Sequence, residues 1–180
     1  MEINRVEKYK ILNSKDLQRL KKRLNQAEGF NKNLASQIIK LIENIDKKKI
    51  NNTGSLIEII DDPKKGGFFL RLKSIDNNID IDISLYRNYI EMYVAEKLYP
   101  IFDSDFISNE KKILEYLKHW FKKDIIRETK YTKNSIKSDS FFYYDSGNKI
   151  KLHETRDIKQ IFKKGQTSKI QKYNKWVNDK

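Results

Sequence analysis

The sequence predicts an α+β fold, in which an N-terminal helical hairpin and a third amphipathic helix pack on one face of an antiparallel β-sheet. Two observations carry this prediction. Apolar residues recur at helical spacing near the N-terminus and again past the middle of the chain. The segments between and after these helices alternate apolar and polar residues or form short β-rich runs, which indicates a meander followed by a C-terminal hairpin.

The first two helices are expected to form a hairpin over about residues 14–48. Ser14 is a suitable N-cap, and Gly29 supplies a stop. Two apolar stripes mark the helices: Leu17, Leu20, Leu24 and Ala27, and then Leu34, Ile38, Leu41 and Ile45. A turn at residues 29–31 would join them as antiparallel neighbours.

Short strands are expected to follow the helical hairpin. The runs at 56–60 and 68–72 flank a loop that contains Pro and Gly, and residues 79–83 alternate Ile with Asp. Residues 86–98 fit either a helix or a strand. A strand is preferred because sequential strands usually lie side by side. Pro100 is expected to end this segment.

A third amphipathic helix is expected around residues 113–121, where the apolar pattern is the clearest in the chain. Three strand-like runs follow it, at 125–132, 140–144 and 149–153. The last two flank the sequence Asp-Ser-Gly-Asn at 145–148. A short polar turn with Gly between two β-rich runs predicts a tight hairpin.

Positive charge is concentrated at both ends of the chain. The formal net charge is +13, from 38 basic and 25 acidic residues, and residues 50–155 contribute equal numbers of each. We assign residues 1–155 to a single α+β domain, with its sheet and third helix over about 55–154. Residues 156–180 are assigned to a cationic C-terminal tail that is partly helical. Such a distribution favours an anionic partner, either nucleic acid or an acidic protein.

Candidate binding residues lie at these two ends. They are Lys21, Lys22, Arg23, Lys163, Lys164, Lys169, Lys172, Tyr173, Lys175 and Trp176. The cations would neutralise phosphates, and Tyr173 and Trp176 would stack on bases. We therefore expect a non-enzymatic protein that binds nucleic acid without strong sequence specificity. Two alternatives are that the tail docks on its own domain, burying Ile170, Tyr173 and Val177, or rests on a membrane surface.

Other functions stay open. Small size and ten Tyr residues give a general likeness to immunity proteins and phage-encoded inhibitors, which occlude a toxin or effector protein. The sequence Glu128-Thr129-Lys130 resembles the second half of the PD-(D/E)xK nuclease signature, which implies a small metal-dependent nuclease. The nearest upstream acids with suitable spacing, Asp103 and Asp105, are separated from Glu128 by the predicted third helix. Asp80 and Asp82, on one face of an alternating strand, are further candidate carboxylates for such a metal site.

The composition argues against several other classes. There is no Cys, there are only two His, and no phosphate-binding glycine loop is present, so we expect no catalytic residue, resident metal or cofactor. No apolar run reaches the length of a membrane span, and the first residues are too charged for a signal peptide. A cytoplasmic protein is therefore expected.

Overall fold

The computed structural model describes residues 5–75, 79–87, 89–95, 97–102, 110–132, 135–156 and 167–177, with the backbone alone for residue 5 and residues 97–102. It confirms the α+β class. The described part of the chain forms three α-helices and two antiparallel sheets, one of six strands and one of four. The expected meander and C-terminal hairpin therefore belong to two separate sheets.

The α-helices are α1 (Ser14–Gln26), α2 (Lys32–Glu43) and α4 (Glu110–Lys122), and η1 (Lys47–Lys49) is a short 3-10 helix. The larger sheet follows chain order through β1 (Arg5–Lys10), β2 (Leu56–Asp61), β3 (Gly67–Leu72), β4 (Ile81–Leu85), β5 (Ile90–Val94) and β6 (Lys97–Phe102). The smaller sheet has the strand order β10 (Thr167–Tyr173), β7 (Ile125–Thr132), β8 (Ser135–Asp145) and β9 (Asn148–Arg156). No helix in the described part of the chain is long and apolar enough to cross a membrane.

Asparagine side chains cap the first two helices. Asn13, and not Ser14, is the N-cap of α1, because its Oδ1 accepts hydrogen bonds from the backbone N–H groups of Lys15 (3.0 Å) and Asp16 (3.3 Å). Asn31 caps α2 in the same way. A short side-chain oxygen at this position satisfies backbone donors that the helix itself cannot pair.

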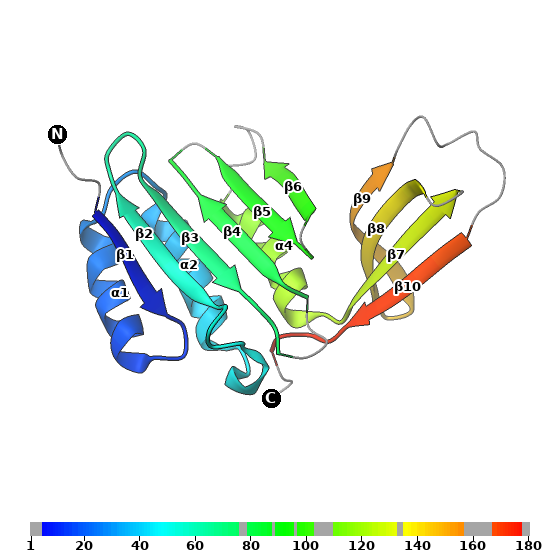
Figure 1. Cartoon of the computed structure of the whole chain (residues 1–180), viewed down its shortest axis with the longest axis horizontal. Helices are drawn as coiled ribbons and strands as arrows, with labels where there is room; N and C mark the ends of the chain where they lie inside the picture. Colours follow the sequence, from blue (N-terminus) through cyan, green and yellow to red (C-terminus); the bar gives the residue numbers. More distant parts are fainter. Residues whose placement is uncertain are drawn as a thin grey trace.

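The core lies between the larger sheet and the three helices, which all lie on one face of that sheet (Figure 1). Alternate residues of the strands point into it. Ile81 and Ile83 are fully buried, as the alternation at 79–83 predicts, whereas Asp80 and Asp82 face the other side and lie beside Lys73. The period-two pattern of a strand thus places one set of side chains against the helices and the other set towards solvent.

Two strands of the larger sheet differ from the expectation. Strand β1 was not predicted, because charged residues obscure its alternation, yet its Tyr9 is buried in the core. Pro100 does not end the segment at 86–98. It lies within β6 opposite Glu91, in the last strand of the sheet. An edge strand tolerates Pro because one of its sides makes no ladder hydrogen bonds.

The smaller sheet packs against the C-terminal half of α4. Trp120 contacts Phe141 with 5.5 Å between ring centroids, and the Tyr143 ring stacks on His119 at 5.1 Å. The predicted hairpin joins β8 to β9 through Ser146 and Gly147, both with positive φ. Two successive residues in the left-handed region match the twist of the strands that they connect.

Acidification is expected to weaken the fold through its two histidines. Burial lowers the pKa of His119 and of His153 below the ordinary value of 6.5, and Lys123 lowers that of His119 further. A histidine with a lowered folded-state pKa contributes fully to stability above pH 6.5, and the contribution is lost as the pH falls through the folded-state pKa. Urea unfolding should give a lower free energy of unfolding at about pH 5 than at about pH 7. His119→Gln should reduce this difference, and equal values at both pH would contradict the prediction.

Candidate functional site

The tail is a strand where the sequence suggested a helix. Residues 167–173 form β10, which pairs antiparallel with β7 over its whole length. The spacing of Ile170, Tyr173 and Val177 fits a helix, but Ile170 is 61% exposed, so these three residues do not form a buried stripe. Backbone hydrogen bonds to the edge of β7 outweigh the local helical pattern.

Trp176 is part of the core and cannot stack on a base. Its side chain is fully buried, and its Nε1–H donates to the backbone carbonyl of Ile79 at 3.0 Å. Its backbone N–H donates to the Phe121 carbonyl, and its own carbonyl accepts from the N–H of Asp46. This corrects the stacking role expected for Trp176, because the residue fixes the end of β10 to the helical layer.

The cations of α1 lie far from those of β10, at the opposite end of the molecule (Figure 1). Arg23 is half-buried and pairs with Glu7 at 2.9 Å and with Asp61. Lys21 pairs with Glu43 at 2.5 Å, and Lys22 is exposed. The two cationic ends therefore do not form one site, and Arg23 is engaged by carboxylates of β1 and β2. Lys163 and Lys164 fall outside the described residues.

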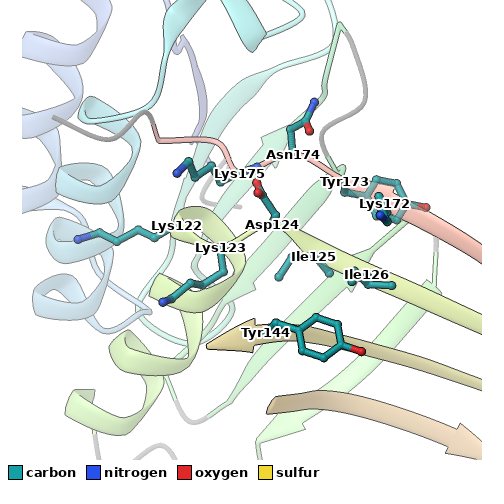
Figure 2. A pocket seen from close by; sticks show the side chains of 10 residues that line it. All are labelled: Lys122, Lys123, Asp124, Ile125, Ile126, Tyr144, Lys172, Tyr173, Asn174 and Lys175. Atoms are coloured by element: carbon teal, nitrogen blue, oxygen red, sulfur yellow. Dashed lines mark hydrogen bonds between the residues drawn. The ribbon is translucent and has the colours of Figure 1, made fainter. Parts of the chain in front are cut away.

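A basic pocket of about 470 Å³ lies where the end of α4, the start of β7 and the end of β10 meet (Figure 2). It is lined by Lys122, Lys123, Asp124, Ile125, Ile126, Tyr144, Lys172, Tyr173, Asn174 and Lys175. The tail residues Lys172, Tyr173 and Lys175 were expected binding residues. Lys122 and Tyr144 were not predicted to be binding residues. One is a solvent-facing lysine of a helix and the other a tyrosine of a strand, and nothing in the sequence indicates that either lies beside the tail.

Hydrogen bonds hold the backbone around this pocket. The backbone N–H of Lys175 donates to Oδ1 of Asp124 at 2.8 Å, and the Lys175 carbonyl accepts from Nζ of Lys49 at 2.8 Å. Lys123 pairs with Asp145 at 3.1 Å and lies over the Tyr143 ring. The lysines are thus presented from backbone that is fixed in place, which would reduce the ordering cost of binding an anion.

The pocket continues onto one face of the smaller sheet, which we call the basic face. Strand register places Lys172, Ile126, Phe142 and Lys151 in one row across the sheet, and every second row from it lies on the same side. Its charged residues are the cations Lys130, Lys149, Lys151, Arg156 and Lys172 and the carboxylates Glu128 and Glu154. Five cations against two carboxylates leave this face positive.

The carboxylates of the basic face are shared between cations. Glu128 lies 3.7 Å from Lys130 and 3.6 Å from Lys149. Glu154 accepts from Arg156 and Lys151, and these two hydrogen bonds lower its pKa to about 2. Exposed ion pairs contribute only about 0–1 kcal/mol each, so these cations can exchange a carboxylate for a phosphate at little cost.

Tyr144 supplies the accessible ring of this surface. It is 57% exposed and contacts Phe142 edge to face at 5.8 Å. Phe142 is itself buried beneath Lys149, whose Nζ lies 3.6 Å from the ring centroid. Tyr144 is therefore better placed to stack on a ligand than either Tyr173, which is half-buried, or Trp176.

Comparison of the chain with protein-family models, with curated proteins and with solved structures returned no match. What the protein does is therefore inferred from the chemistry of the pocket and the basic face. Both present amines beside an exposed ring, which is chemistry suited to a ligand with phosphates and flat bases.

The carboxylates considered for a nuclease do not meet. Asp80 lies beside the larger sheet, 3.4 Å from Lys73, whereas Glu128 belongs to the smaller sheet and lies beside two lysines. Within the described residues, no three His, Asp or Glu side chains gather as a metal site would require. Asp80 and Glu128 therefore do not belong to one metal site, and Asp103 and Asp105 fall outside the described residues.

Proposed function

We propose that the protein binds single-stranded nucleic acid through the basic pocket and the basic face, without strong sequence specificity. The observation that carries the proposal is the exposed ring of Tyr144 between the lysines of the pocket and those of the sheet. Successive phosphates would contact Lys122, Lys123 and Lys172, while a base stacks on Tyr144. Stacking accepts every base, because each has a π-face.

The kinds of cation present support binding without sequence readout. Seven of the eight cations on the pocket and the basic face are Lys, and Arg156 alone carries a guanidinium. An ammonium group contacts phosphate as a point charge, whereas bidentate recognition of a guanine edge uses the planar fork of Arg. The surface is therefore suited to the backbone of a nucleic acid more than to its sequence.

Binding is expected to depend steeply on salt and on the pocket lysines. Binding is measured by fluorescence anisotropy with a labelled single-stranded oligonucleotide. The basic-pocket triple variant combines Lys122→Gln, Lys123→Gln and Lys172→Gln. It should bind the oligonucleotide at least about tenfold more weakly than wild type at low salt. Loss of three phosphate contacts should also make the slope of log K against log salt less steep by roughly 2.

Tyr144→Ala should weaken binding of the same oligonucleotide by about tenfold through lost stacking.

A matched triple variant on the helices serves as the control. Lys15, Lys22 and Lys40 are exposed on α1 and α2, and their replacement by Gln removes the same charge from the other end of the molecule. This variant should bind almost as wild type does. Equal losses in the two triple variants would show that net charge alone attracts the oligonucleotide and would refute a localised site.

One observation favours a second candidate, a protein that occludes a protein partner. Four of the exposed large apolar side chains lie on the smaller sheet: Ile136, Tyr144, Ile150 and Ile170. Exposed apolar groups beside a ring are typical of interface anchors. On this proposal a purified stoichiometric complex would survive about 0.5 M salt, where phosphate contacts are screened. Ile170→Ala would weaken this complex at that salt concentration, because it removes an exposed apolar contact without changing the charge of the basic face.

A further inference from the structure

A second cavity of about 550 Å³ lies apart from the basic pocket. It is formed by the β2–β3 loop, the β4–β5 turn and Gly29 of the α1–α2 connection. In Figure 1 the β2–β3 loop and the β4–β5 turn lie at the upper end of the larger sheet, whereas β10 approaches that sheet at its lower end. The two surfaces are therefore separate, and a ligand of one does not contact the other.

The cations of this cavity come from two different loops. Lys64 and Lys65 belong to the β2–β3 loop, and Arg87 belongs to the β4–β5 turn. No carboxylate lines the cavity among the described residues. Asp62 of the same loop is engaged in its own turn, where Oδ1 accepts from the backbone N–H groups of Lys64 (2.7 Å) and Lys65 (2.8 Å). These bonds lower the pKa of Asp62 and fix the loop that carries both lysines.

Two glycines allow the α1–α2 connection and the β2–β3 loop to pack closely beside the cavity. A Cβ atom on Gly29, where φ is +92°, would lie 2.1 Å from the Asp62 carbonyl oxygen. A Cβ atom on Gly66 would lie 2.4 Å from the carbonyl oxygen of Glu28. Only glycine allows such an approach, so the two loops meet backbone to backbone and the position of Lys64 and Lys65 is fixed relative to the α1–α2 connection.

Aromatic rings form another part of the cavity lining. Tyr86 and Tyr89 stack with 4.2 Å between ring centroids, and Phe69 meets Tyr86 edge to face at 5.5 Å. Burial raises the pKa of Tyr86, so its phenol stays neutral. Tyr89 is 45% exposed and has one face against Tyr86, which leaves its other face for a ligand. The stack is supported from behind, so a ring placed on it meets a rigid surface.

We infer that this cavity binds a nucleoside phosphate, with its base on the free face of Tyr89 and its phosphates between Lys64, Lys65 and Arg87. Cations from two loops suit a group with several charged oxygens, and Arg87 can bind two of them at once. The stacked tyrosines add a preference for a planar ring. The inference goes beyond the proposed function, because it concerns a small ligand at a surface separate from the basic face.

Titration calorimetry with adenosine 5′-triphosphate and with base-free tripolyphosphate tests the inference. The nucleotide should saturate one site per chain, and tripolyphosphate should bind about tenfold more weakly because it cannot stack. Tyr89→Ala should weaken nucleotide binding about tenfold, and Tyr89→Phe should preserve it. Arg87→Gln should weaken the binding of both ligands.

The basic-pocket triple variant, which combines Lys122→Gln, Lys123→Gln and Lys172→Gln, separates this site from the proposed function. It should bind the nucleotide as wild type does, and Tyr89→Ala should bind the oligonucleotide as wild type does. Loss of nucleotide binding in the basic-pocket variant would show that the nucleotide binds at the basic pocket and would overturn the inference. Three other results would each overturn the inference. They are a wild-type protein that does not bind the nucleotide, a Tyr89→Ala variant that binds it with unchanged affinity, and a wild-type protein that binds tripolyphosphate as tightly as the nucleotide.

Discussion

Replacing Trp176 by Ala is expected to lower the free energy of unfolding by about 3–5 kcal/mol, which is the usual cost of deleting a large buried ring. The side chain is fully buried, and its N–H is bonded to the Ile79 carbonyl. The variant would leave a cavity beside Phe121 and an unpaired carbonyl at Ile79. Urea unfolding followed by circular dichroism measures the loss.

Two further variants make the Trp176 result specific. Trp176→Phe keeps a ring and loses the N–H donor, so its destabilisation should be smaller. Lys169→Ala changes an exposed residue of β10 and should alter the free energy of unfolding by at most about 0.5 kcal/mol. If Trp176→Ala cost no more than Lys169→Ala, the tail would not be fixed to the core as described.

The tail cannot be removed without removing part of the core. Deleting residues 156–180 would remove β10 and Trp176 together, so weaker binding in such a truncated chain would not separate lost contacts from lost structure. Point substitutions at exposed residues of the pocket are the cleaner test. Lys172 and Tyr144 meet this requirement because both are exposed.

Asp139→Ala is expected to destabilise the protein by about 3–5 kcal/mol, since it removes one partner of a buried ion pair. The carboxylate of Asp139 is fully buried and accepts from Nε (3.0 Å) and Nη2 (2.9 Å) of Arg127 and from Oγ1 of Thr129 (2.9 Å). The hydrogen bonds from Arg127 raise the pKa of its guanidinium strongly. Without Asp139, a largely buried cation would remain unpaired in the smaller sheet.

A double variant distinguishes loss of the pair from loss of packing. Asp139→Leu combined with Arg127→Met replaces both charges with apolar groups, and such a replacement is often close to neutral. Its free energy of unfolding should therefore exceed that of Asp139→Ala. A double variant no more stable than the single one would show that packing around Asp139, and not its charge, holds these strands together.

Several elements were predictable because their determinants are local. The alternation at 79–83, the turn at 145–148 and the apolar pattern of α4 all depend on neighbouring residues. The surroundings of the candidate binding residues were less predictable. Arg23 looks like a surface cation in the sequence, yet it pairs with Glu7 and Asp61, which lie on two different strands.

By itself the amino-acid sequence determined the α+β class, most of the helices and strands, and the excess of lysine, because spacing and composition are properties of the chain alone. Tertiary structure decided that residues 167–173 pair as a strand with β7, that Trp176 enters the core, and that Lys122, Tyr144 and Lys172 line one pocket. The physical reason is that each outcome depends on a segment distant in the sequence. Residues 167–173 need the unpaired edge of β7, Trp176 needs a place among side chains of the core, and the pocket needs elements that the fold brings together.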